Sequence, residues 1–176
     1  KWHLGHTTWF FEEFVLKPHF ENYKIFHPDF AYVFNSYYES VGEKVLRTNR
    51  GNLSRPSVDE VYVYRNYVTK RMQTFLEQKP SDEVLKIIEI GIHHEKQHQE
   101  LLLTDIKYIL GHNPLFPAYD KSFSELNVET QTQKWINIEE GIYEIGHNDD
   151  SFCYDNELGR HKVYLENFEI RNTLVT

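Results

Sequence analysis

The stretch SDEVLKIIEIGIHHEKQHQELLLTDIKYILG, residues 81–111, decides the fold of this chain. Its start favours a helix, because Ser81 can act as an N-cap and the acidic pair that follows suits the positive end of the helix dipole. Apolar residues then recur at helical spacing, and Gly111 is a typical C-terminal stop. These apolar positions are Val84, Leu85, Ile88, Ile92, Leu101, Leu102, Ile106 and Ile109. We therefore predict one amphipathic helix, roughly 40 Å long at 1.5 Å per residue.

Other segments before this stretch also show helical patterns. Ser57 and Glu60 form a capping box at the start of one helix. In the first segment, aromatic and apolar side chains cluster on one side, and Lys17-Pro18 is expected to end the helix. The predicted helices cover residues 2–16, 29–46 (a short helix or pair of turns) and 58–78, with a polar loop over 47–55. Three or four long amphipathic helices joined by loops predict a mainly α fold, an antiparallel bundle; the resemblance described below implies a four-helix bundle.

The character of the sequence changes after Asn113-Pro114. A polar stretch is followed by short runs of alternating apolar and polar residues, which predict β-strands over 135–138, 142–145 and 162–170. We divide the chain into a helical domain over residues 1–118, a linker over 119–134 and a β-rich segment over 135–176. This last segment is too short to close a sandwich or a barrel. We therefore expect the incomplete start of a second domain, in a chain that is a fragment of a longer protein; the resemblance described below implies that this domain is α+β.

Composition and charge exclude several classes of protein. The chain has 19 Lys and Arg against 27 Asp and Glu, a net charge of −8, which disfavours a protein that tracks nucleic-acid phosphates. Its single cysteine, Cys153, excludes an internal disulfide framework and a Cys-rich zinc module, and is typical of a reducing compartment. No apolar run of about 18 residues is present, so no membrane span is predicted. We expect a cytoplasmic protein without nucleic-acid or membrane partners, and the oligomeric state stays open.

The densest chemical signal is the histidine-rich middle of the long helix. His94 and His98 are four residues apart, so their imidazoles share one helix face and can bind one metal ion. A third ligand is expected from another helix. His6 is the first choice, because it faces the aromatic side of the 2–16 helix, where an unpaired imidazole would be costly. His3 is the second choice. A polar helix face and a core histidine bonded to a carbonyl or to Glu13 remain the alternatives.

The same helix also matches a zinc-peptidase signature, in which His94 and His98 would bind zinc and Glu95 would be the general base. The longer form of that signature has a glycine three residues after the second histidine, where this chain has Leu101, and no third histidine follows at the required spacing. Five other histidines lie at helix ends or in loops and are expected to be solvated. They are His19, His27, His112, His147 and His161.

Two motifs in this order resemble the DinB-like domain of the sulfoxide synthases of ergothioneine biosynthesis. They are WHLGHTTWFFE, residues 2–12, and HHEKQHQELLLTD, residues 93–105. NPLFPAY, residues 113–119, is similar as well. Those proteins also contain a sulfatase-modifying-factor domain, which is similar to the formylglycine-generating enzyme. FCYDNE (152–157) and RHKVYLE (160–166) resemble the opening of that domain.

The resemblance implies an iron enzyme. In that family three histidines hold a mononuclear non-haem Fe(II), and the matching positions are His6, His94 and His98. Gln97 matches a residue beside the substrate imidazole. The family uses O2 to join the sulfur of cysteine or γ-glutamylcysteine to C2 of the hercynine imidazole as a sulfoxide. An active-site tyrosine of the family lies in the part of the second domain beyond Thr176, so we expect this chain alone to lack turnover.

Further residues and functions are left open at this point. On the helical side, Arg55, Arg65 and Tyr64 are candidates for contacting a substrate carboxylate, although surface solvation or helix packing is the favoured explanation for each of them. An alternative enzyme class is a DinB-like hydrolase or thiol transferase that binds Zn or Ni, since a fold does not fix a function. A further alternative is a non-catalytic helical bundle in which the histidines only pack.

Overall fold

The computed structural model describes residues 1–36, 38, 41–122 and 132–175, which form two compact units. The first unit, Lys1–Lys121, is helical, and the second, Ser122–Thr176, contains the strands found among the described residues. The mainly α fold with a short β segment is thus confirmed. The predicted linker over 119–134 falls largely on residues 123–131, which lie outside the described residues.

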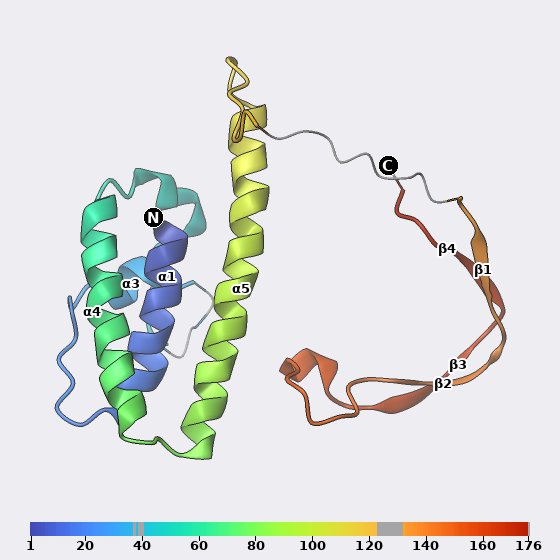
Figure 1. Ribbon diagram of the computed structural model, residues 1–176, viewed down its shortest axis with the longest axis horizontal. Helices are drawn as coiled ribbons and strands as arrows, with labels where there is room; N and C mark the ends of the chain where they lie inside the picture. Colours follow the sequence, from blue (N-terminus) through green and yellow to red (C-terminus); the bar gives the residue numbers. More distant parts are fainter. Residues whose placement is uncertain (37, 39–40, 123–131, 176) are drawn as a thin grey trace. The chain divides into compact units, whose positions relative to one another are not determined.

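Three long helices build the first unit. The helix α1 (Trp2–Phe11) lies between α4 (Val58–Glu77) and α5 (Asp82–Gly111) and packs against both (Figure 1). The predicted capping box is present, since the side chains of Ser57 and Glu60 exchange hydrogen bonds with each other's backbone N–H groups. The helix α5 begins directly after Ser81 and ends at Gly111, as predicted. The sequence pattern therefore located both long helices closely.

The first helix runs further than predicted. After α1 the chain makes a π-helical turn, Glu12–Leu16, and continues into a short helix α2, Lys17–His19. Pro18 does not end the helix at Lys17, because the chain accommodates it at the start of α2, directly after the π-helical turn. The π-helical turn aims the Glu12 side chain toward α4, a contact that stabilises the fold.

The region between α2 and α4 is less helical than predicted. Only Phe30–Phe34 of the expected 29–46 segment forms a helix, α3. The expected loop over 47–55 instead contains a 3-10 helix, Arg47–Asn52. Since α3 has only 5 residues, the arrangement as a four-helix bundle stays a prediction.

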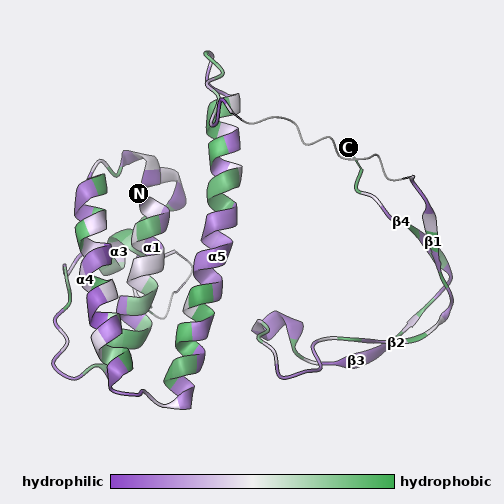
Figure 2. Ribbon diagram, in the orientation of Figure 1, coloured by the Kyte–Doolittle hydropathy of each residue, from purple (hydrophilic) through white to green (hydrophobic). Residues whose placement is uncertain are grey.

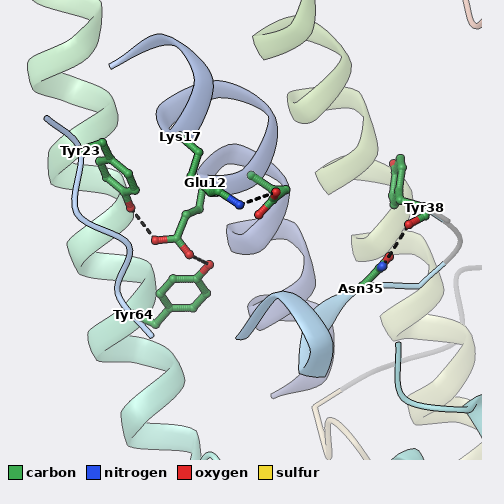
Figure 3. A network of polar contacts seen from close by, with 7 residues as sticks. Glu12, Lys17, Tyr23, Asn35, Tyr38 and Tyr64 are labelled. Carbon is green, nitrogen blue, oxygen red and sulfur yellow. Dashed lines mark hydrogen bonds and ion pairs between the residues drawn. The ribbon is translucent and has the colours of Figure 1, made fainter. Parts of the chain in front are cut away.

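The core of this unit is aromatic and lies where α1, α3 and α4 meet. Trp9, Phe34 and Tyr64 are its largest fully buried side chains. A buried carboxylate ties the helices together. Glu12 accepts hydrogen bonds from the hydroxyls of Tyr23 at 2.6 Å and Tyr64 at 2.5 Å (Figure 3) and from the backbone N–H of Phe26 at 3.0 Å. A buried charge thus has hydrogen-bond partners on both oxygens, which offsets much of its desolvation cost.

The apolar positions of α5 are not buried along the whole helix. Hydrophobic and hydrophilic residues alternate along this helix (Figure 2), and its buried positions are Val84, Ile88, Gly91 and His98. Beyond His98, Leu103 and Ile109 are exposed by 60% and 61%. The reason is geometric: α5 extends past the ends of α1 and α4 (Figure 1), so its last turns have no helix to pack on within the first unit.

The second unit consists of two antiparallel ladders. One pairs β1 (Trp135–Ile138) with β4 (Phe168–Arg171), and the other pairs β2 (Gly141–Ile145) with β3 (His161–Leu165). The predicted 162–170 strand is therefore two strands that belong to different ladders. None of the described helices has the length and apolar content needed to cross a membrane.

Candidate metal centre

Three histidines from two helices converge on one point. His6 of α1 and His94 and His98 of α5 each offer a ring nitrogen, and these atoms all lie within 4.8 Å of one another. The Nε2 atoms of His6 and His94 are 3.1 Å apart. Two nitrogens that bind one ion at about 2.1 Å and at about a right angle are roughly 3.0 Å apart, so this spacing suits neighbouring ligands. The predicted cluster of His6, His94 and His98 is thus confirmed as a set that is close enough to hold a metal ion.

The helices approach closely enough for this because of two glycines. A Cβ on Gly91 of α5 would lie 2.7 Å from the Phe11 ring of α1, and a Cβ on Gly5 would lie 2.1 Å from the Phe34 ring of α3. Glycine is therefore needed at both contacts. Gly91 lies one turn before His94, and Gly5 directly precedes His6, so these close contacts also place the ligands.

His6 is held in one orientation by its surroundings. Only 2% of the residue is exposed, and its ring stacks between Trp2, at 4.7 Å between centroids, and Trp9, at 5.5 Å. Its Nδ1 lies 2.6 Å from the carbonyl oxygen of Phe34 and must donate there, because a carbonyl only accepts. The lone pair of a neutral His6 is therefore on Nε2, which faces His94.

Burial keeps the three imidazoles neutral. Desolvation lowers the pKa of His6 to about 3, although the hydrogen bond to Phe34 opposes the shift. Desolvation and the neighbouring His94 and His3 lower the pKa of His98 to about 4. Desolvation also lowers the pKa of His94. Only a neutral imidazole has a lone pair for a metal ion, so the site is ready to bind a cation at neutral pH.

The facing ring nitrogens of His6 and His94 fit a metal ion. The Nε2 atoms of His6 and His94 face one another, and a hydrogen bond between them can use only one of the two lone pairs. A bound cation would engage both. The donor set of nitrogens alone accepts iron, zinc, nickel or copper, so the geometry does not choose the metal.

The histidines open onto a cavity of about 560 Å³. Its cationic side chains are Arg47 and Arg50, both from the 3-10 helix that the sequence pattern treats as a loop. The Arg50 guanidinium lies 4.1 Å from the centroid of the Trp2 ring, which in turn stacks on His6. The remaining lining residues are Trp2, His3, His6, Ser36, Tyr38, His94, Gln97, His98, Leu101 and Asp105.

Gln97 lies at this cavity, and the three other substrate-binding candidates do not line it. Tyr64 is fully buried on α4 and donates to Glu12. Arg65 of α4 forms an ion pair with Glu95 of α5 and donates a hydrogen bond to Thr7 of α1. Arg55 lines a different cavity, beside Phe30 and Pro56. Arg55, Arg65 and Tyr64 thus lie away from the histidine cavity, whose arginines are Arg47 and Arg50, and their contact with a substrate stays a prediction.

The ion pair of Arg65 with Glu95 also bears on the zinc-peptidase alternative. In that signature the glutamate must face the metal as general base. Here Glu95 is engaged by Arg65 of the neighbouring helix, and it does not line the histidine cavity. The role that the signature gives to Glu95 has no support in this geometry.

The histidines outside the cluster follow the prediction with one exception. His19, His27, His112 and His161 are exposed. His147 is half-buried instead, and its Nε2 lies 3.2 Å from a carboxylate oxygen of Asp149.

The sequence left His3 open as an alternative metal ligand and did not indicate a role for Asp105. His3 is not one of the three converging histidines, and its Nδ1 lies 2.8 Å from Nδ1 of His98. Its Nε2 lies 2.9 Å from Oδ2 of Asp105. A signal was available in the spacing: His3 and His6 are three residues apart, and His98 and Asp105 are seven apart, so each pair shares a helix face.

No family model matches the sequence, and the search of curated proteins finds no significant relative.

Proposed function

We propose that this chain is the metal-binding part of a non-haem Fe(II)-dependent, O2-using sulfoxide synthase of ergothioneine biosynthesis. The observation that carries the proposal is the convergence of His6, His94 and His98 beside a cavity that also holds cationic side chains. The motif resemblance supplies the reaction and the metal. The proposed architecture is a DinB-like four-helix bundle followed by the start of a sulfatase-modifying-factor-like domain.

The ligand set suits the proposed chemistry. An iron ion held by three neutral imidazoles would keep coordination positions for other ligands, as in the two-histidine, one-carboxylate triad of non-haem iron oxygenases. Bound Fe(II) would supply the redox chemistry with O2 that zinc lacks. The protein would hold the ion through His6, His94 and His98. The stacked rings of Trp2 and Trp9 fix His6 and keep water away from one side of the site.

The cavity offers groups for the substrates, which we infer to be hercynine and cysteine or γ-glutamylcysteine. Both carry carboxylates, and guanidinium groups are well suited to bind them. Arg47 and Arg50 are the cationic residues of the cavity and therefore the inferred carboxylate partners. Gln97 lies one residue before His98, in reach of a substrate imidazole at the metal. Holding both substrates at one ion would make bond formation effectively intramolecular.

Anaerobic titration of the 176-residue chain with Fe(II) tests this proposal. We expect one ion per chain for the unchanged protein and a large loss of uptake for His98→Ala. His112→Ala is the matched control, because His112 is an exposed histidine at the end of the same helix. Equal uptake by His98→Ala and the unchanged protein would refute the metal centre.

The Zn and Ni alternatives use the same three nitrogens and need a separate measurement. Elemental analysis of protein purified without added metal, together with an assay for C–S bond formation by the full-length enzyme, distinguishes them. The proposal expects iron and sulfoxide product. Zinc or nickel at full occupancy without C–S bond formation would favour a DinB-like hydrolase or transferase.

A further inference from the structure

A chain of hydrogen bonds runs from the metal centre to the surface. It joins Nδ1 of His98 to Nδ1 of His3 at 2.8 Å, and Nε2 of His3 to Oδ2 of Asp105 at 2.9 Å. The chain crosses twice between α5 and α1. His3 has 19% of its side chain exposed, and Asp105 has 55%, so the environment becomes more aqueous away from His98.

The carboxylate at the end of this chain determines where each proton lies. An ionised carboxylate only accepts hydrogen bonds, so Nε2 of His3 must donate to Asp105. In neutral His3 the other nitrogen, Nδ1, then carries the lone pair and accepts. Nδ1 of His98 must therefore donate to His3, which leaves the lone pair of His98 on Nε2.

The same tautomer is imposed on His6 by a different group, the carbonyl oxygen of Phe34. Two of the three converging histidines thus have Nδ1 engaged by a fixed acceptor and Nε2 free for a ligand bond. Protein groups that fix a metal-binding histidine in this way commonly raise metal affinity by a factor of about 10–100.

We propose that His3 and Asp105 are positioning residues of the metal centre: they hold His98 in the tautomer and orientation that present Nε2 to the ion. This inference rests on the proposed metal centre but not on the identity of its metal. It assigns His3 a role in support of a ligand, in place of the role as ligand that the sequence left open. It also gives Asp105, an exposed residue, a function that its burial does not suggest.

Binding of Co(II) to the 176-residue chain tests the inference. Co(II) reports its ligands through its visible absorption spectrum. We expect His3→Phe, which keeps a ring against Trp2, to weaken Co(II) binding about 10–100-fold. His3→Asn should recover part of the loss, because its amide oxygen can accept from Nδ1 of His98. Asp105→Ala should weaken binding about tenfold, and His112→Phe should leave it unchanged.

A second measurement reads the tautomer directly. In 15N-histidine-labelled, Zn(II)-loaded protein, the nitrogen shifts of His98 should show a protonated Nδ1 and a metal-bound Nε2. In Asp105→Ala, His98 should show a mixture of states or a weakened hydrogen bond at Nδ1. Asp105→Ala changes an exposed side chain, so it is expected to fold, and circular dichroism checks this.

The outcomes separate this inference from the proposal on which it rests. If the unchanged protein does not bind Co(II), the metal centre itself is wrong. If the unchanged protein binds Co(II), and His3→Phe and Asp105→Ala bind it with the same affinity, spectrum and nitrogen shifts, the metal centre stands and the positioning role is overturned.

Discussion

Glu12 is a buried carboxylate that joins several parts of the helical unit. It is 4% exposed, and its two oxygens accept hydrogen bonds from Tyr23, Tyr64 and the backbone of Phe26. Burial and the adjacent carboxylate raise the pKa of both tyrosines, so both hydroxyls stay protonated and donate. Figure 3 shows the two phenol groups directed at the carboxylate from either side.

Removal of one of these donors should destabilise the fold. Tyr64→Phe leaves the buried carboxylate with one hydrogen bond fewer, and we expect it to lower the free energy of unfolding by about 1.5–3 kcal/mol. The matched control is Tyr62→Phe, because Tyr62 lies on the same helix and is 51% exposed. Urea denaturation compares the two, and equal stabilities would show that Glu12 does not need the Tyr64 hydroxyl.

The ligand residues could be predicted from sequence, whereas their supporting residues could not. The ligand residues were predicted from patterns within single helices. These patterns are the spacing of His94 and His98 and the aromatic face around His6. Contacts such as His3 with Asp105 join residues 102 positions apart and depend on how α1 crosses α5. The guanidinium of Arg50 reaches the site only because a 3-10 helix forms where the polar sequence favours a loop.

At the scale of helices, the close packing of α1 depends on positions without a side chain. Gly5 meets the ring of Phe34, whose backbone carbonyl accepts from His6, and Gly91 meets the rings of Phe10 and Phe11. Helix propensity alone would favour alanine at such positions by roughly 0.5–1 kcal/mol. The contacts across the interface outweigh that preference.

We therefore expect Gly5→Ala to destabilise the protein by about 1–3 kcal/mol, since the new methyl group overlaps the buried Phe34 ring. Gly111→Ala serves as the control: no atom lies within 4 Å of a Cβ at the last residue of α5. Its stability should change by less than about 1 kcal/mol. Thermal or urea denaturation measures both, and a Gly5→Ala protein as stable as the unchanged one would contradict the proposed contact.

The elements that the sequence located well are those with local signals. The capping box at Ser57 and the periodic apolar residues after it define α4, and Gly111 ends α5. The helix boundaries that the sequence did not predict depend on contacts with neighbouring parts of the fold. Pro18 continues the first helix because a π-helical turn precedes it, and the 29–46 segment keeps only five helical residues at Phe30–Phe34.

For the whole molecule, burial of the histidine cluster links stability to pH. The ordinary pKa of histidine, 6.5, applies to the unfolded chain, while the folded values are about 3 for His6 and about 4 for His98. Between these limits the unfolded chain binds more protons, so the free energy of unfolding decreases as the pH falls below about 6.5. Each of the two histidines should contribute a loss of about 1–2 kcal/mol by pH 5.

Urea denaturation between pH 7.5 and 5 measures this dependence in metal-free protein. Carboxylates also contribute to stability in this range, so the informative comparison is with His98→Gln, which removes one titrating group. The variant should lose less stability over the interval than the unchanged chain does. Parallel pH profiles would mean that His98 is not held neutral by the fold.

The central claim is that one cation is bound jointly by α1 and α5. Diffraction from crystals of the Fe(II)-loaded chain, measured on both sides of the iron absorption edge, tests it most directly. We predict one anomalous peak per chain, about 2.1 Å from Nε2 of His6, His94 and His98. A map with no peak among these three nitrogens, or with the ring of His6 turned away from those of His94 and His98, would contradict the account.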